Sequence, residues 1–202
     1  MESDHELLQA WQAGDARAGS TLFERHYKCV ARFFSNKVDA DIADLIQKTF
    51  LGCLESLHRF RGDASFKTYL LSIARNVLLM YYRRKRRHDA RLDPGVTSIQ
   101  DLGPTPTTLI QRHDEAKALL LGLRALPIDS QILLELYYWE SMRAREIAAV
   151  FEVPEGTIRT RLRKAKQQLL VGVESARAGG HLTPHSIEDL DDWARRLRAA
   201  SA

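Results

Sequence analysis

The sequence is poor in cysteine and in long apolar runs. Only two of its 202 residues are cysteines, Cys29 and Cys53, and they form no CxxC pair, which excludes a disulfide framework. We expect both to act as small apolar side chains. The longest apolar-rich stretch, residues 69–82, contains Arg75 and Asn76 and is too short and too polar to span a bilayer. The N-terminus lacks the basic-then-apolar order of a signal peptide, so we expect a cytoplasmic protein without membrane insertion.

Motifs typical of enzymes are also missing. The seven histidines are scattered, with no HExxH motif and no paired metal-ligand spacing. No glycine-rich loop suited to cradling a phosphate is present. We therefore expect no catalytic residue, no metal and no cofactor, and a nucleic-acid-processing enzyme is the least favoured function class.

Acidic residues are scarce in one part of the chain. The net charge is only +4, from 30 Lys+Arg against 26 Asp+Glu, and by itself identifies no partner. Residues 59–91, however, hold 10 basic and 2 acidic groups, whereas residues 1–58 hold 6 and 9. Such segregation favours binding to nucleic acid or an anionic surface, with a solvated helix face as the simpler alternative.

No stretch alternates with a period of two for long, while apolar residues recur at three- and four-residue spacing almost everywhere. The pattern predicts an all-α fold, in which Asp41 and Asp44 cap and charge the first turn of one helix. Proline and glycine interrupt the pattern from residue 89 onward. We therefore expect two small helical domains at 1–88 and 112–171, a flexible linker at 89–111, and a C-terminal extension at 172–202.

The extension contains one further amphipathic pattern. After the Gly179-Gly180 break, Ser186 can cap a helix. One face of that helix carries Ile187, Leu190, Trp193 and Leu197. Leaving this face in water is unfavourable, so we expect it to pack on the chain's own domains, where it could mask a binding surface, or on a separate inhibitor protein. A frayed terminus is the alternative.

In the second domain, residues 144–151, 152–154 and 155–166 predict a helix, a tight turn and a second helix. Their internal packing is expected from Ile147, Ala148, Val153, Ile158 and Leu162. The second helix carries Thr157 and Thr160 near its N-terminal end and the cations Arg159, Arg161, Arg163, Lys164 and Lys166. Such a helix can present base-reading and phosphate-binding groups to DNA, with a solvated basic helix as the alternative. Glu152 falls where the turn requires a left-handed residue, at a cost of about 1 kcal/mol.

The first domain ends in a basic helix. Gly62 and Asp63 indicate a turn, and Ser65 can cap the helix that follows. Its buried face is expected to comprise Leu70, Ile73, Ala74, Val77 and Leu78. Its other face offers Arg75, Asn76, an aromatic at Tyr81 or Tyr82, and the consecutive cations Arg83, Arg84, Lys85, Arg86 and Arg87. Aromatic rings among cations suit unstacked bases, although core aromatics and a solvated charge run explain the pattern equally well.

Taken together, these stretches resemble the extracytoplasmic-function sigma factors of bacterial RNA polymerase, over about residues 5–88 and 112–171. The matching segments are an opening helix at 7–27, DIADLIQKTF at 41–50, FRGD at 60–63 with IARN at 73–76, and VPEGTIRTRL at 153–162. The resemblance implies sigma region 2 followed by a linker and the helix-turn-helix of sigma region 4.

The resemblance also implies three sets of site residues. A pocket for a base flipped out of the minus-ten promoter element would comprise Phe60, Arg61, Gly62, Asp63, Ala64 and Asn76, with Arg75, Tyr81 and the cations 83–87 as neighbouring DNA contacts. The minus-thirty-five element would be read by Thr157, Arg159, Thr160, Arg161, Arg163 and Lys164. Core polymerase would face the helix that carries Asp44, Gln47, Lys48 and Phe50, in which Lys48 replaces the family's usual acid.

The function implied is that of an alternative sigma factor, which binds core RNA polymerase and promoter DNA and catalyses nothing itself. An anti-sigma factor or self-inhibition by the tail would regulate it. A stand-alone helix-turn-helix regulator is the alternative. That reading explains residues 144–166 but leaves the segment 60–76 and the polymerase-like helix unused.

Overall fold

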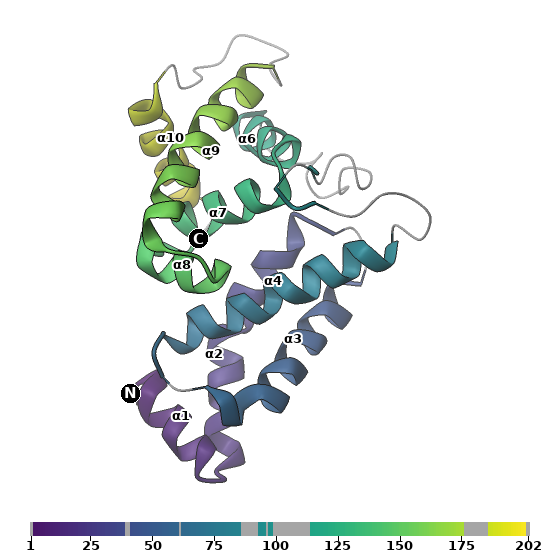
Figure 1. Ribbon diagram of the computed structural model, residues 1–202, viewed down its shortest axis with the longest axis vertical. Coiled ribbons are helices and arrows are strands. Elements are labelled where there is room, and N and C mark those ends of the chain that lie inside the picture. The colour runs from purple at the N-terminus through teal and green to yellow at the C-terminus, as the bar shows by residue number, and fades with distance from the viewer. Residues whose placement is uncertain are drawn as a thin grey trace. The chain divides into compact units, whose positions relative to one another are not determined.

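A computed structural model describes residues 2–38, 41–60, 62–85, 93–95, 97–98, 114–175 and 186–200. Within these ranges the chain is helical, and its only β-type pairing is an isolated bridge between Ser98 and Pro127, which confirms the all-α prediction. The helices in chain order are α1 (Asp4–Gln12), α2 (Ala16–Ser35), α3 (Ile42–Ser56), the short 3-10 helix η1 (Leu57–Arg59), α4 (Phe66–Lys85), α6 (Asp114–Ala125), α7 (Ile128–Tyr138), α8 (Ala144–Phe151), α9 (Glu155–Ser175) and α10 (Ile187–Ala200) (Figure 1). Two compact units result, residues 1–87 with 149–152 and residues 88–148 with 153–202.

The first unit begins with two helices where one was expected. The prediction of a single helix over residues 7–27 is wrong, because the chain turns between α1 and α2. Gly14 adopts a φ of +103°, which a side chain would make costly. Asp15 then caps α2, accepting a hydrogen bond from the Arg17 amide at 2.8 Å.

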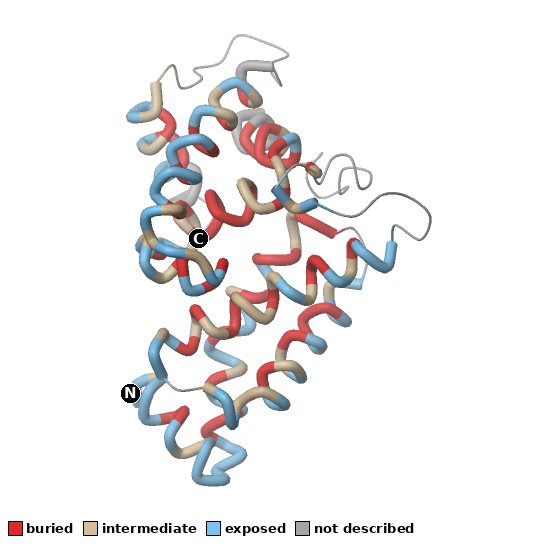
Figure 2. Tube along the Cα trace, viewed as in Figure 1, coloured by how far each residue is buried: buried red, intermediate tan, exposed pale blue. Residues whose placement is uncertain are grey.

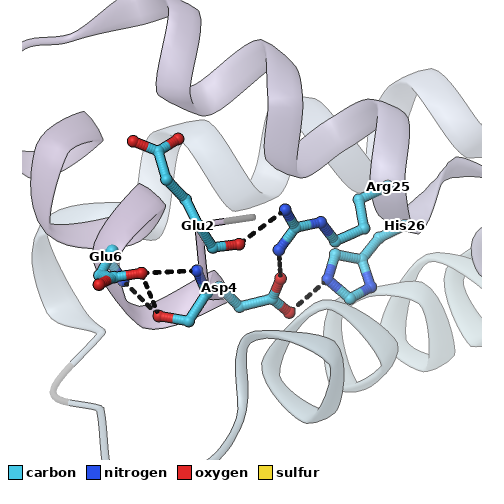
Figure 3. Close-up of polar contacts among 6 residues, drawn as sticks. Glu2, Asp4, Glu6, Arg25 and His26 are labelled. Atoms are coloured by element: carbon cyan, nitrogen blue, oxygen red, sulfur yellow. Dashed lines mark hydrogen bonds and ion pairs between the residues drawn. The ribbon is translucent and has the colours of Figure 1, made fainter.

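Polar contacts fasten α1 to α2 (Figure 3). Asp4 bridges two residues of α2, with one carboxylate oxygen 2.5 Å from the Arg25 guanidinium and the other 2.7 Å from Nε2 of His26. Burial alone would raise the pKa of Asp4, but the hydrogen bonds and charges of Arg25 and His26 outweigh it and hold that pKa below its usual value. Ser3 and Glu6 form a reciprocal capping box at the start of α1.

Apolar contacts complete the attachment of α1. The Trp11 ring meets Phe23 edge-on at 5.1 Å between centroids and Phe66 at 6.4 Å. Gly19 lies directly beneath it, so close that a Cβ there would come within 2.6 Å of the indole nitrogen. The tryptophan thus occupies space that only a glycine on α2 leaves open.

Helices α2, α3 and α4 pack together, and each turns a buried face inward (Figures 1 and 2). Cys53 is fully buried, and burial raises the pKa of its thiol to about 12, which fits the apolar role expected for it. On α4 the buried set differs from the prediction: Leu71 belongs to it, while Ile73 and Val77 are only half-buried. Asp41 does not cap α3 as expected, because it takes a left-handed φ of 65° and its side chain makes no capping bond.

In the second unit, α6, α7 and α9 form the core. Helices α6 and α9 approach closely at two glycines, since Gly172 lies against the backbone of Gly122. Part of the predicted linker also belongs here. The carbonyls of Thr97 and Pro94 accept hydrogen bonds from the amides of Ile128 and Asp129, at 2.9 and 3.0 Å, and so satisfy the free N-terminal donors of α7.

The C-terminal helix α10 packs on α7 and α9. Ser186 caps it as predicted, accepting a hydrogen bond from the Asp189 amide at 3.1 Å. Leu190, Trp193 and Ala194 are buried in the contact. Of the two docking alternatives for the tail, the structure therefore has it on the chain's own second unit, while Leu197 has a side chain outside the described part.

Candidate nucleic-acid and polymerase surfaces

A capped turn brings two aromatic rings together at the start of α4. Gly62 takes a φ of +81°, and Ser65 caps the helix through the Thr68 amide at 3.1 Å, as predicted. The Phe60 ring stacks on Tyr69 with centroids 4.5 Å apart. The Tyr69 hydroxyl is in turn hydrogen-bonded to Ser56. Tyr69 was not singled out from the sequence, because only the folded turn brings it to Phe60.

The other predicted pocket residues lie around this turn. Gly62 and Asp63 are exposed and Ala64 is half-buried, whereas Arg61 lies outside the described residues. Asn76 is exposed on α4. It follows Tyr69 by seven positions, so it lies two helical turns and about 10 Å further along the same face. The structure thus pairs Phe60 with Tyr69 and has Asn76 on the stripe that begins there.

The same stripe of α4 continues to the basic end of the helix. Met80, which no sequence motif marks as a site residue, follows Asn76 by one turn and is 49% exposed. Arg83, Arg84 and Lys85 are exposed and Arg75 is partly exposed, while Arg86 and Arg87 lie outside the described residues. We call Tyr69, Asn76, Met80 and Arg83 the α4 stripe.

Of the two tyrosines near this end, only one is accessible. Tyr82 is buried, and its hydroxyl donates to the backbone carbonyl of Lys37. Tyr81 is partly exposed, with the Lys85 ammonium 5.8 Å from its ring centroid. Tyr81 is therefore the aromatic that accompanies the cations, and Tyr82 belongs to the core.

Helix α3 has an apolar outer face. Leu51 and Leu54 are 51% and 53% exposed, although the apolar period of the sequence groups Leu54 with the core. Asp44, Gln47 and Lys48 are exposed at helical spacing from them. This set, Asp44, Gln47, Lys48, Leu51 and Leu54, forms one surface, which we call the α3 face.

Two predicted polymerase residues differ in their surroundings. Lys48 forms an ion pair with Asp44 one turn earlier, so the two charges on the α3 face offset each other. Phe50 is half-buried, and its ring centroid lies 4.4 Å from that of Phe23. Phe50 thus points largely toward α2, and the large exposed apolar side chains of α3 are Leu51 and Leu54.

The first helix and the turn have the predicted bounds, with α8 at 144–151 and α9 beginning at Glu155, whereas α9 continues to Ser175, beyond the predicted end at residue 166. Glu152 adopts the left-handed conformation that the turn requires, with a φ of +56°, and the Val153 amide donates to the Ala148 carbonyl at 3.1 Å. The turn therefore keeps its geometry without glycine. Ile147, Ala148, Ile158 and Leu162 are buried as expected, and Val153 is half-buried.

The predicted base-reading residues of α9 are accessible. Arg159, Thr160, Arg161, Arg163 and Lys164 are exposed, and Thr157 is half-buried. The Arg159 guanidinium pairs with Glu155 at 2.6 Å, and the Thr160 hydroxyl donates to the Gly156 carbonyl at 3.2 Å. Lys166 differs from these cations, because it is buried against α10.

Comparisons with known proteins agree with these features. The family model "Sigma-70 region 2" matches residues 22–88, and "Sigma-70, region 4" matches residues 116–169. The ECF RNA polymerase sigma-E factor of Escherichia coli strain K12 is 26% identical over 176 residues, covering 83% of this chain and 92% of that protein. The sigma-E factor of Haemophilus influenzae is 27% identical over 177 residues, covering 83% and 93%.

Two solved structures share the fold. CnrH in complex with the cytosolic domain of CnrY has a TM-score of 0.63 at 20% identity and covers 86% of this chain and 99% of that chain. The sigma factor RpoE from Bartonella quintana, in complex with the anti-sigma factor NepR, has a TM-score of 0.58 at 18% identity and covers 78% and 98%.

None of the helices in the described ranges is long and apolar enough to cross a membrane.

Both sigma regions are present in their family order, the helix-turn-helix is formed, and the matched relatives are covered almost completely. The chain belongs to the extracytoplasmic-function sigma factors, the non-enzymatic proteins that direct transcription initiation by RNA polymerase.

Proposed function

We propose that this sigma factor divides its work among three surfaces. The α3 face binds core RNA polymerase, the α4 stripe with Phe60 holds the opened minus-ten element, and the N-terminal turns of α9 read the minus-thirty-five element. The chain catalyses no reaction, since polymerase supplies the chemistry, and it acts where polymerase acts, in the cytoplasm. Residues 1–88 and 112–171 are the working domains, with the linker at 89–111 and the extension at 172–202.

The observation that carries the minus-ten assignment is the α4 stripe. Opening a promoter takes at least one base out of the stack, at a cost of a few kcal/mol. Stacking on an aromatic wall and hydrogen bonding to an amide offset part of that cost. The stripe offers the Phe60–Tyr69 ring pair, then the exposed amide of Asn76, then Met80 and the cations that follow.

The polymerase contact rests on the α3 face. Leu51 and Leu54 are two half-exposed leucines one turn apart. Leaving both side chains in water is unfavourable, so they favour a protein partner. Because Lys48 and Asp44 offset each other, the apolar atoms of Leu51 and Leu54 contribute most of the contact. Lys48 in place of the family's acid therefore costs less affinity than the substitution suggests.

The exposed cations of α9 support the minus-thirty-five assignment. Arg159, Arg163 and Lys164 lie in the N-terminal half of the recognition helix, the part that reaches base edges in the major groove. Arg159 must exchange its contact with Glu155 for a base. A partner that silences these surfaces is also proposed, because one structural relative is a sigma factor held by an anti-sigma factor.

In vitro initiation with core polymerase tests the minus-ten assignment. Asn76→Ala should lower initiation on duplex promoters about tenfold, and markedly less on templates already unpaired at the minus-ten element. Glu24→Gln, an exposed change on α2, is the matched control and should leave both templates unaffected. Equal loss on both templates would remove the melting role of Asn76.

Binding to core polymerase tests the α3 face separately. Leu51→Asp or Leu54→Asp should weaken binding at least tenfold, while Met80→Asp, an equally exposed apolar residue on α4, should not. Failure of the wild-type chain to bind core polymerase at all would favour a stand-alone helix-turn-helix regulator instead.

A further inference from the structure

Helix α10 is an addition to a family domain. It begins at Ile187, beyond residue 169, where the region 4 family model ends. The helices it packs on, α7 and α9, lie largely within that model. A surface of the common domain is thus covered here by a helix that the family model lacks.

One carboxylate anchors α10. Asp191 accepts hydrogen bonds from the Lys166 ammonium at 2.7 and 2.9 Å and from the Tyr138 hydroxyl. Burial and the adjacent Asp191 both raise the pKa of Tyr138, so that hydroxyl stays a donor. The Lys166 ammonium also lies 4.4 Å from the Tyr137 ring centroid. Lys166 is 9% exposed with α10 in place, so a helix that covers this face buries the cation and must supply it with a negative partner.

The apolar part of the contact is small and imperfect. Only Leu190, Trp193 and Ala194 of α10 are buried, among the side chains that the structure describes. No protein atom accepts a hydrogen bond from the buried Trp193 indole nitrogen, which is unfavourable. The free-energy cost of removing Lys166 and Asp191 from water also offsets much of the attraction between them. The attachment is therefore specific in chemistry but weak enough to be reversible.

The anchor lies away from the DNA-reading residues. Lys166 follows Arg163 and Lys164 on α9, yet those two are exposed while Lys166 faces α10. Releasing α10 would therefore open the face formed by α7 and the later part of α9, and leave the reading residues as they are.

We propose that α10 is a releasable ligand held in cis on a helix-binding site of region 4. The site comprises Tyr137, Tyr138 and Lys166 with the apolar surface beneath Leu190 and Trp193. Its other occupant is an amphipathic helix of a partner protein whose N-terminal half is acidic, as that of α10 is with Glu188, Asp189, Asp191 and Asp192. A tethered helix competes at an effective concentration in the millimolar range, so the partner binds only when α10 is loosened.

Fluorescence anisotropy of a labelled peptide of residues 186–200 tests the proposal on the full chain. The Asp191→Asn chain should bind the peptide at least tenfold more tightly than the wild-type chain, because its own helix has lost its anchor while Lys166 remains. The Asp192→Asn chain is the matched control and should behave as wild type, since Asp192 is exposed and pairs only locally with Arg195. A peptide that itself carries D191N should bind none of them.

A second chain variant protects the test against misfolding. Leu190→Ala weakens the apolar contact without touching the buried charge, and it should also raise peptide affinity. Equal peptide affinity of the wild-type, D191N and L190A chains would overturn the proposal. The proposal would also be overturned if the D191N chain failed to bind an unrelated amphipathic helix that keeps only Leu190, Asp191, Trp193 and Ala194 of α10. The assay contains neither polymerase nor DNA, so its outcome is independent of the promoter-reading assignments.

Discussion

The two terminal helices are attached by the same kinds of residue in different surroundings. Asp4 and Asp191 each bridge two groups of the neighbouring helices, and Trp11 and Trp193 each supply the large apolar contact. At α1 the cation is Arg25, about a quarter exposed; at α10 it is Lys166, almost fully buried. Trp11 fits over a glycine, whereas Trp193 buries an unpaired donor.

The difference separates a permanent attachment from a conditional one. A partly solvated ion pair tolerates the loss of one partner, because water replaces it. At α10 the helix itself buries Lys166, so the ion pair is kept while α10 is bound and is lost as a unit when α10 leaves. We therefore expect α1 to respond to mutation in small steps and α10 to respond as a switch.

Matched removal of the two cations should give the largest contrast. Lys166→Met leaves Asp191 without its cation but with the Tyr138 hydroxyl; because the Asp191 side chain is 23% exposed, the cost stays below the ~3–5 kcal/mol of a fully buried pair. Native-state hydrogen exchange should then find α10 unprotected. Arg25→Met should cost about 1 kcal/mol, since His26 still holds Asp4. Similar losses of protection in α1 and α10 would break the comparison.

A methyl group beneath Trp11 should have the next largest effect. Gly19→Ala would push a Cβ into the indole ring and lower the free energy of unfolding by about 1–3 kcal/mol. Gly156→Ala is the control and should not destabilise, because an added Cβ there would meet no atom within 4 Å outside the backbone of its own helix. Denaturant unfolding measures both, and an unchanged midpoint for Gly19→Ala would show that Trp11 is not fixed in place.

Acid should loosen α1 through Asp4. Since the pKa of Asp4 is lowered in the folded chain, its contribution is complete above the unfolded value near 4 and is lost as the pH falls through the folded value. The effect is about 1 kcal/mol, as for other partly exposed pairs. Exchange of α1 amides between pH 6 and pH 3 should report it. In Asp4→Asn this part of the pH dependence should disappear.

The smallest effect concerns Trp193. Trp193→Phe removes the unpaired indole donor but also some buried area, so α10 should be held as well as in the wild type or up to about 1 kcal/mol better. Protection factors of α10 amides measure the change. A clear loss of protection would mean that the indole nitrogen has a partner, a bound water for example.

Local signals in the sequence predicted much of this molecule. Ser65 and Ser186 start their helices as expected, and α8 and the start of α9 lie where predicted, because caps and apolar periods act within a few residues. The division of residues 7–27 was missed, since a single Gly14 decided it. The exposure of Leu51 depends on where α2 and α4 pack, which no period on α3 reveals.

The site residues divide in the same way. Sequence alone selected Asn76 and Arg163, and both are exposed, as the proposed DNA contacts require. It did not identify Tyr69, because the contact between the Tyr69 and Phe60 rings forms only when the turn before α4 is folded. Nor did it separate Lys166 from its neighbours, because a cation's burial is set by a helix more than twenty residues away.

Pro94 and Thr97 bond to α7, so the segments before and after them join different parts of the chain. An insertion at 86–92 would add residues between Lys85 of the first unit and Pro94, which bonds to α7. An insertion at 99–113 would instead lengthen a segment whose flanking residues, Ser98 and Asp114, both belong to the second unit. Relatives could therefore vary freely in the second segment, whereas length changes in the first would alter which promoter spacings the protein tolerates.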